Sequence, residues 1–114
     1  MNDCLFCKIA GHEIDSDIVY EDESLMAFHD IHPKAPIHIL IIPKKHIATL
    51  NDLTEEDTLL AGSMIQTAKK LASQLEIAEN GYRLLFNVNS YGGQLVYHIH
   101  LHLLGGRPMH WPPG

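Results

Sequence analysis

Hydrophobic residues occur along this chain in short runs that have the length and the pattern of β-strands. Residues 18–20 and 25–29 flank the polar segment Glu-Asp-Glu-Ser and predict a hairpin. Residues 38–42 form an almost unbroken β-branched run, typical of a central buried strand. Residues 82–88 and 96–104 alternate with period two. The pattern therefore predicts a mainly antiparallel sheet of about five strands.

Two helices complete the prediction. Residues 5–10 indicate a short helix that ends at Gly11. Thr54 is expected to cap a long amphipathic helix, because three acidic residues follow it. The buried stripe of that helix is predicted from apolar residues at helical spacing: Leu60, Met64, Ala68, Leu71 and Leu75. The fold class is therefore α+β, with residues 1–114 forming one domain and residues 105–114 a C-terminal tail.

Composition narrows the functional classes. The chain has 114 residues, a net charge of -6 and eight basic residues, so it lacks the Lys and Arg clusters that bind a nucleic acid backbone. Its apolar runs fall short of the roughly 20 residues that span a membrane. The start Met-Asn-Asp-Cys has neither the basic nor the apolar part of a signal peptide, so we expect a cytoplasmic protein. A small anionic ligand in a local pocket is compatible with this composition.

Three of the nine histidines alternate with apolar residues in the last predicted strand. His98, His100 and His102 are expected on one face, with imidazoles about 6.6 Å apart, because each residue of a strand rises about 3.3 Å. Three interpretations are open: ligands of a catalytic zinc, a covalent nucleophile with its helpers, or a polar strand face.

Cys4 and Cys7 have the spacing with which two thiolates bind one tetrahedral metal. A redox pair would need a preceding strand, for which residues 1–3 are too short. A disulfide is disfavoured in a reducing compartment, and buried cysteines on a short helix are the remaining alternative. Zinc is the leading interpretation, and it requires two further ligands.

Several further segments accompany the alternating histidines: Phe28-His-Asp-Ile31, Pro36-Ile-His38, Pro43-Lys-Lys-His46, Gly92-Gly-Gln94, Gly105-Gly-Arg-Pro108 and His110-Trp-Pro-Pro-Gly114. Together they resemble the Hint branch of the histidine triad (HIT) family, the purine nucleoside phosphoramidases. The resemblance covers essentially the whole chain. It implies a HIT-like fold whose sheet continues across a homodimer.

The resemblance also implies roles for individual residues. His100 would be the nucleophile, while His102 and His38 would bind phosphate oxygens and protonate the leaving group. His98 would join this catalytic group and also complete a closed structural zinc site with Cys4, Cys7 and His46. The nucleotide would bind Asp30 through its ribose, and further contacts would come from Phe6, Ile9, Phe28, His29, Ile31, Asn87, Gly93, Gln94 and, from the partner's tail, Trp111.

The expected reaction is hydrolysis of purine nucleoside phosphoramidates, and of aminoacyl adenylates, through a nucleotidyl-histidine. With His98 in the zinc site, His100 and His102 cannot alone supply three ligands to a catalytic metal, so no catalytic cofactor is expected. The alternatives are a dinucleoside polyphosphate hydrolase, a nucleotidyl transferase and a non-catalytic nucleotide-binding module. Members of the Hint branch have a hydroxyl or acidic side chain at position 95, where this chain has Leu95. This difference is expected to affect substrate preference rather than the reaction itself.

Overall fold

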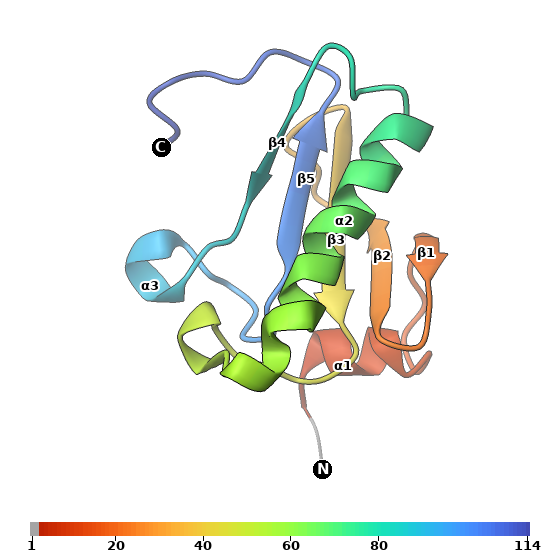
Figure 1. Cartoon of the computed structure of the whole chain (residues 1–114), viewed down its shortest axis with the longest axis vertical. Helices are drawn as coiled ribbons and strands as arrows, with labels where there is room; N and C mark the ends of the chain where they lie inside the picture. Colours follow the sequence, from red (N-terminus) through yellow and green to blue (C-terminus); the bar gives the residue numbers. More distant parts are fainter. Residues whose placement is uncertain (1–2) are drawn as a thin grey trace.

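The computed structural model describes residues 3–114 and contains one five-stranded sheet in the order β1-β2-β3-β5-β4. Every neighbouring pair is antiparallel (Figure 1). The elements are α1 (Leu5–Ala10), β1 (Ile18–Glu21), β2 (Leu25–His29), β3 (Ile37–Pro43), α2 (Thr58–Gln74), β4 (Tyr82–Leu85), α3 (Asn89–Gly92) and β5 (Leu101–Gly105). Short 3₁₀ turns at Leu50–Asp52 and Glu55–Asp57 precede α2. The predicted α+β class and antiparallel sheet are confirmed.

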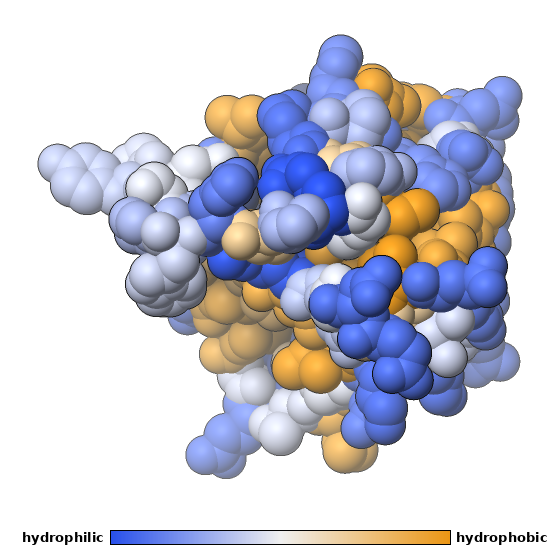
Figure 2. Space-filling view, turned by 90° about the horizontal axis from the view of Figure 1, so that it is seen from above, coloured by the Kyte–Doolittle hydropathy of each residue, from blue (hydrophilic) through white to orange (hydrophobic). Residues whose placement is uncertain are grey.

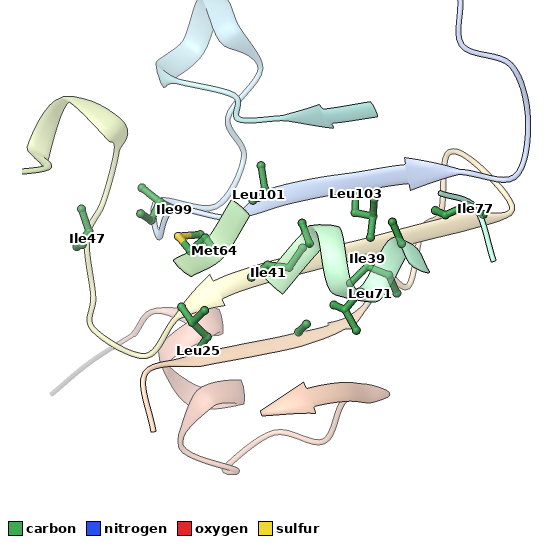
Figure 3. Packing of buried hydrophobic residues seen from close by; sticks show 13 residues of the cluster. Leu25, Ile39, Ile41, Ile47, Met64, Leu71, Ile77, Ile99, Leu101 and Leu103 are labelled. Carbon is green, nitrogen blue, oxygen red and sulfur yellow. The ribbon is translucent and has the colours of Figure 1, made fainter. Parts of the chain in front are cut away.

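One face of the sheet packs against α2 and forms the main core (Figure 3). Because side chains alternate along a strand, Ile39 and Ile41 of β3 share this face with Leu101 and Leu103 of β5. Met64 lies against them from α2, as the helical stripe predicts. Each such buried aliphatic side chain stabilises the fold by about 1.5–3 kcal/mol, so this layer holds the central strands rigidly.

The opposite face carries the alternate residues of the same strands. Phe28 and Leu40 pack there against Phe6 and Ile9 of α1. His102 pairs with Leu40 in the β3–β5 register, and the same parity places it on the α1 side of the sheet. The sheet therefore separates a purely apolar core from a face that carries histidines.

The last two strands are shorter than predicted. Residues 96–100 lie outside β5, so the predicted strand 96–104 is wrong in its first half, and β4 ends at Leu85 rather than Val88. Continuing the observed register would place Pro43 opposite Ile99, and proline has no N–H to donate to the ladder. Ile99 instead donates its N–H to the Ile47 carbonyl at 2.8 Å.

The long helix also begins later than predicted. Thr54 caps the 3₁₀ turn Glu55–Asp57, with its N–H donating to Asp57 Oδ2 at 3.0 Å, and α2 follows at Thr58. Between β4 and β5 the chain forms the single-turn helix α3. These differences change element ends but leave the strand order that positions the histidines.

The chain leaves the sheet after β5 through a glycine that no other residue replaces easily. Gly106 has φ +89°, and a Cβ built there would lie 2.8 Å from Pro36 Cβ. The C-terminal segment then runs away from the sheet on the β4 side, and it projects sideways when the molecule is seen from above (Figures 1 and 2). No helix within residues 3–114 has the length and apolar character to cross a membrane.

Candidate active site and metal cluster

A cavity of about 650 Å³ opens on the histidine face of the sheet. This volume lies within the range that small-molecule and cofactor sites occupy. The cavity brings together eleven of the residues predicted from sequence: Phe6, Ile9, Phe28, His29, Asp30, Ile31, His38, Asn87, Gly93, His100 and His102. Its walls are mostly apolar, so polar groups that point into it are few and specific.

His100 is held by a single backbone hydrogen bond. Its Nδ1–H donates to the His98 carbonyl at 2.8 Å, and only 8% of the residue is exposed. This bond selects the tautomer whose lone pair is on Nε2. The Phe6 ring packs edge-on against the imidazole, with centroids 5.0 Å apart, and restricts its rotation. His100 thus presents one oriented, neutral nitrogen.

A second hydrogen-bond chain fixes the tautomers of His38 and His102. The Lys34 N–H donates to His38 Nδ1 at 3.0 Å, so the hydrogen of a neutral His38 is on Nε2. That Nε2–H donates to His102 Nδ1, also at 3.0 Å, and His102 therefore carries its own hydrogen on Nε2. His102 Nε2 is buried without a partner in residues 3–114. This series of hydrogen bonds therefore ends at the His102 Nε2–H, a donor without an acceptor on a residue that lines the cavity.

Burial keeps these imidazoles neutral. It lowers the pKa of His38, an effect that the Asp30 carboxylate partly offsets, and it lowers the pKa of His100. The pKa of His102 falls to about 4, first because of burial and then because positive charge on His100 and His38 would repel its own. Asp30 Oδ2 lies 3.5 Å from His38 Nε2, the nearest negative charge to this group. A lone pair on His100 is therefore available at neutral pH.

The low pKa of His102 predicts that acid destabilises the fold. An unfolded histidine titrates near 6.5, so between about pH 6.5 and pH 4 the unfolded chain binds a proton that native His102 does not. The contribution of neutral His102 to the free energy of unfolding is complete above pH 6.5 and is lost as the pH falls toward 4. We expect urea midpoints to fall from pH 7 to pH 5, and to fall less in His102→Asn. Equal pH dependence in the two proteins would contradict this assignment.

The four residues that the family resemblance implied as metal ligands come together at one end of the sheet. Cys4, Cys7, His46 and His98 each offer one ligand atom, and all four atoms lie within 4.8 Å of one another. His98 is fully buried, and its Nε2–H donates to the Pro43 carbonyl at 2.7 Å. That bond leaves the Nδ1 lone pair directed at the cluster, the arrangement by which an outer hydrogen bond orients a metal-binding histidine.

The separations in the cluster fit a tetrahedral ion. Nδ1 of His98 lies 3.2 Å from Nδ1 of His46, 3.3 Å from Cys4 Sγ and 3.4 Å from Cys7 Sγ. Bonds of about 2.0–2.3 Å around a tetrahedral centre require ligand atoms roughly 3.3–3.8 Å apart. The group could therefore bind a metal ion with little movement.

His98 connects the two sites. Its side chain belongs to the cysteine cluster, while its backbone carbonyl holds His100. Its own ring does not line the cavity. Because the His98 ring belongs to the cluster and the His98 carbonyl orients His100, the orientation of His100 depends on how well the cluster is ordered.

Two predicted nucleotide contacts lie outside the cavity lining. Gln94 is 5% exposed and bound within the protein: Oε1 accepts from the Asn89 N–H at 3.0 Å, and Nε2 donates to the Ala48 and Val96 carbonyls at 2.7 and 3.1 Å. It clamps the loop that carries Gly93. Trp111 is 82% exposed on the C-terminal segment and does not line the cavity of its own chain.

The cavity also has lining residues that the sequence analysis missed. Leu40 and Leu104 share the face of His38 and His102, and the same period-two count would have found them. Asp15 and Ser16 come from the irregular segment before β1, where no periodic pattern marks a direction. The role of the Lys34 backbone N–H carries no sequence signal either.

Comparison with known proteins agrees with this architecture. The HIT domain family matches residues 11–109. A purine nucleoside phosphoramidase of Escherichia coli is 57% identical over 92% of this chain and 88% of its own. A crystal structure of a HIT family hydrolase from Legionella pneumophila superposes with a TM-score of 0.97 at 62% identity, covering 98% of this chain and 100% of that chain. An uncharacterized HIT-like protein of Synechococcus elongatus is 51% identical over 98% of this chain and 97% of its own.

Proposed function

Because the chain belongs to the HIT family, we propose that it is a nucleotide hydrolase that cleaves the P–N bond of purine nucleoside phosphoramidates. The observation that carries the proposal is the oriented imidazole of His100, whose Nε2 lone pair is free beside a cavity of nucleotide size. The name of the relative from Escherichia coli supplies the substrate class.

The reaction follows from the positions of the ring nitrogens. His100 Nε2 attacks the α-phosphorus in line, which forms a phosphorus–nitrogen bond to the protein while the bond to the leaving amine breaks. An amine leaves poorly as an anion and needs a proton. An anionic phosphate in the cavity favours the charged imidazolium, against the effect of burial, so the His38–His102 pair supplies that proton. Water then cleaves the nucleotidyl-histidine and releases the nucleoside monophosphate.

The remaining cavity residues bind the nucleoside. Asp30 has two carboxylate oxygens for the ribose hydroxyls, and the base lies among Phe6, Ile9, Phe28, His29 and Ile31. Asn87 and Gly93 serve the phosphate, with the Gly93 backbone at φ +82° exposed to a close approach. Gln94 supports this loop through its buried amide. Leu95 extends the apolar wall of the cavity where a polar contact is expected in relatives.

The cysteine cluster is a structural zinc site in this proposal. Cys4, Cys7, His46 and His98 would hold the ion, and four protein ligands leave no position for water. Bound zinc would contribute folding free energy by joining α1 to the segment before β5. The site has no part in the bond changes at phosphorus.

We further propose a homodimer in which the β4 edges of two sheets pair. In the described sheet β4 bonds only β5, and Leu59 and Ile65 of helix α2, which packs on β3 and β5, are 86% and 51% exposed. Arg83 of β4 donates to the His110 carbonyl at 2.9 Å, so each tail is held against this edge. Pairing of the edges would bring Trp111 to the partner's cavity and cover both unpaired strands.

If Trp111 contacts the substrate in the partner's cavity, removal of the tail should weaken substrate binding. Deleting residues 111–114 is expected to raise KM for adenosine 5′-phosphoramidate about three- to tenfold, because an aromatic contact to the substrate is lost, while the thermal midpoint stays the same. Trp111→Phe keeps an aromatic ring and should retain most of the affinity. Unaltered kinetics in the deletion variant would reject a role for Trp111.

The test of the proposed function is release of AMP from adenosine 5′-phosphoramidate by the intact protein, in the presence of a chelator added at the start of the assay. Diadenosine polyphosphates assayed in parallel distinguish the dinucleotide hydrolase. Nucleotide binding without any turnover would identify a binding module instead.

A further inference from the structure

The loop between β2 and β3, residues 30–36, connects two side chains of the proposed active site, Asp30 at its start and His38 just past its end. The loop backbone bonds both of them. The His32 N–H donates to Asp30 Oδ1 at 2.8 Å, and the Lys34 N–H donates to His38 Nδ1 at 3.0 Å. The position of this loop therefore decides how the two side chains are held.

Arg107, which follows β5, bonds this loop from a segment that is distant in sequence. Its guanidinium Nη2 donates to the Lys34 carbonyl at 2.8 Å. In the described chain it is the only side chain from outside residues 30–38 that hydrogen-bonds residues 31–36. Lys34 is thus held through both of its backbone groups, with Arg107 at the carbonyl and His38 at the N–H.

The backbone around this contact is restricted on both sides. Pro33 and Pro36 flank the segment that contains Lys34, and each proline ring fixes its own φ. Gly106, directly before Arg107, lies so close to the loop that a Cβ built there would be 2.8 Å from Pro36 Cβ. The loop and the start of the C-terminal segment therefore pack closely, and Arg107 reaches Lys34 from a defined point.

The neutral ring pair His38–His102 has two possible arrangements of its hydrogens, because either ring can donate to the other. In the first, His38 Nε2–H donates to His102 Nδ1. In the second, His102 Nδ1–H donates to His38 Nε2, and the hydrogen of His38 moves to Nδ1. The Lys34 N–H selects the first, since in the second it would face another N–H at 3.0 Å. Only the first directs the His38 hydrogen toward His102, whose ring centroid lies 4.9 Å from that of His100.

We propose that Arg107 is a positioning residue that keeps the Lys34 N–H against His38 and so keeps the His38–His102 pair arranged to give up a proton. This inference rests on the proposed reaction, in which that pair protonates the leaving amine. Arg107 does not line the cavity, so it acts only through Lys34. Its loss would leave His100 in place and divide the ring pair between the two arrangements.

The kinetic test compares two AMP derivatives that share the nucleoside and differ in the leaving group. The amine of adenosine 5′-phosphoramidate needs a proton, whereas the p-nitrophenyl ester of AMP releases a stable anion. Arg107→Ala is expected to lower the single-turnover rate of leaving-group release about tenfold for the phosphoramidate and less than about twofold for the ester. Arg107→Lys keeps a cationic donor for the Lys34 carbonyl and should restore most of the lost rate. An equal change for both substrates, or no change for either, would overturn the proposal.

Lys70→Ala is the control for the loss of one exposed positive charge. Lys70 lies on α2 and does not line the cavity, so this variant should keep both rates. All rates are measured well below the thermal midpoint of each protein, so that only folded molecules are compared.

Nitrogen-15 NMR of the ligand-free proteins tests the positioning without any substrate. At about pH 8, above the ordinary histidine pKa near 6.5, two-bond correlations show which nitrogen of His38 holds the hydrogen. The wild type should show Nε2–H, and Arg107→Ala a mixture of the two tautomers. The same His38 tautomer in both proteins would overturn the proposal. A wild type that turns over neither substrate would reject the proposed reaction, and the NMR spectra would still decide the role of Arg107.

Discussion

Replacing His100 with alanine is expected to lower kcat/KM for adenosine 5′-phosphoramidate by about 10⁴-fold or more, because the variant has no nitrogen to form the covalent intermediate. The hydrogen bond from Nδ1 to the His98 carbonyl leaves Nε2 as the atom that would attack phosphorus. Release of AMP, followed by chromatography under single-turnover conditions, measures the effect. AMP affinity should change much less, since the base and ribose contacts remain.

His12→Ala is the matched control for this experiment. His12 is a histidine outside the cavity, with 58% of its side chain exposed and, within residues 3–114, only Glu21 as its ionic partner. It should keep wild-type kinetics. A His100→Ala protein with native thermal stability and more than a tenth of wild-type activity would show that another group attacks phosphorus.

Replacing Cys7 with alanine is expected to lower the free energy of unfolding by about 3 kcal/mol or more and to release the metal. In a domain of this size such a loss lowers the thermal midpoint by at least about 10 °C. The cause is the cluster geometry, in which Cys7 Sγ lies 3.3 Å from His46 Nδ1 and 3.4 Å from His98 Nδ1. Elemental analysis should find about one zinc per chain in the wild type and none in the variant.

Lys8→Ala provides the control on the same helix, because Lys8 neighbours Cys7 and has no part in the cluster. It should retain both metal and stability. Native protein that folds stably and contains no metal would contradict a structural zinc site.

The two expected effects are connected through His98. A disordered cluster would release the His98 ring, and the carbonyl of the same residue orients His100. Phe6 reinforces this link, since its ring lies against both imidazoles, with centroids 6.0 Å from His98 and 5.0 Å from His100. Loss of the cysteine cluster is therefore expected to impair the nucleophile without removing it.

Much of the fold could be predicted from sequence because its signals are local. The almost unbroken run at residues 38–42 identified the central strand, and the stripe that includes Met64 and Leu71 identified the packed face of α2. The histidine alternation placed His102 on the correct face. These patterns report which side of an element is buried, and burial drives folding.

What could not be predicted depends on pairing between distant segments. The strand 96–104 loses its first half because register places Pro43 opposite Ile99, a fact that neither segment shows alone. The tautomers of His38 and His102 depend on a backbone N–H at Lys34. Gln94 is buried in a clamp, and Ser16 reaches the cavity from an irregular segment. Each of these is a tertiary contact rather than a property of local sequence.

The most direct measurement of the central claim is mass spectrometry of the protein quenched during turnover of adenosine 5′-phosphoramidate, with the quench kept alkaline so that a phosphorus–nitrogen bond survives. The account predicts one added nucleotidyl group on the peptide that contains His100, present in the wild type and absent from His100→Ala. Turnover at the wild-type rate with no adduct, or an adduct on another residue, would contradict it.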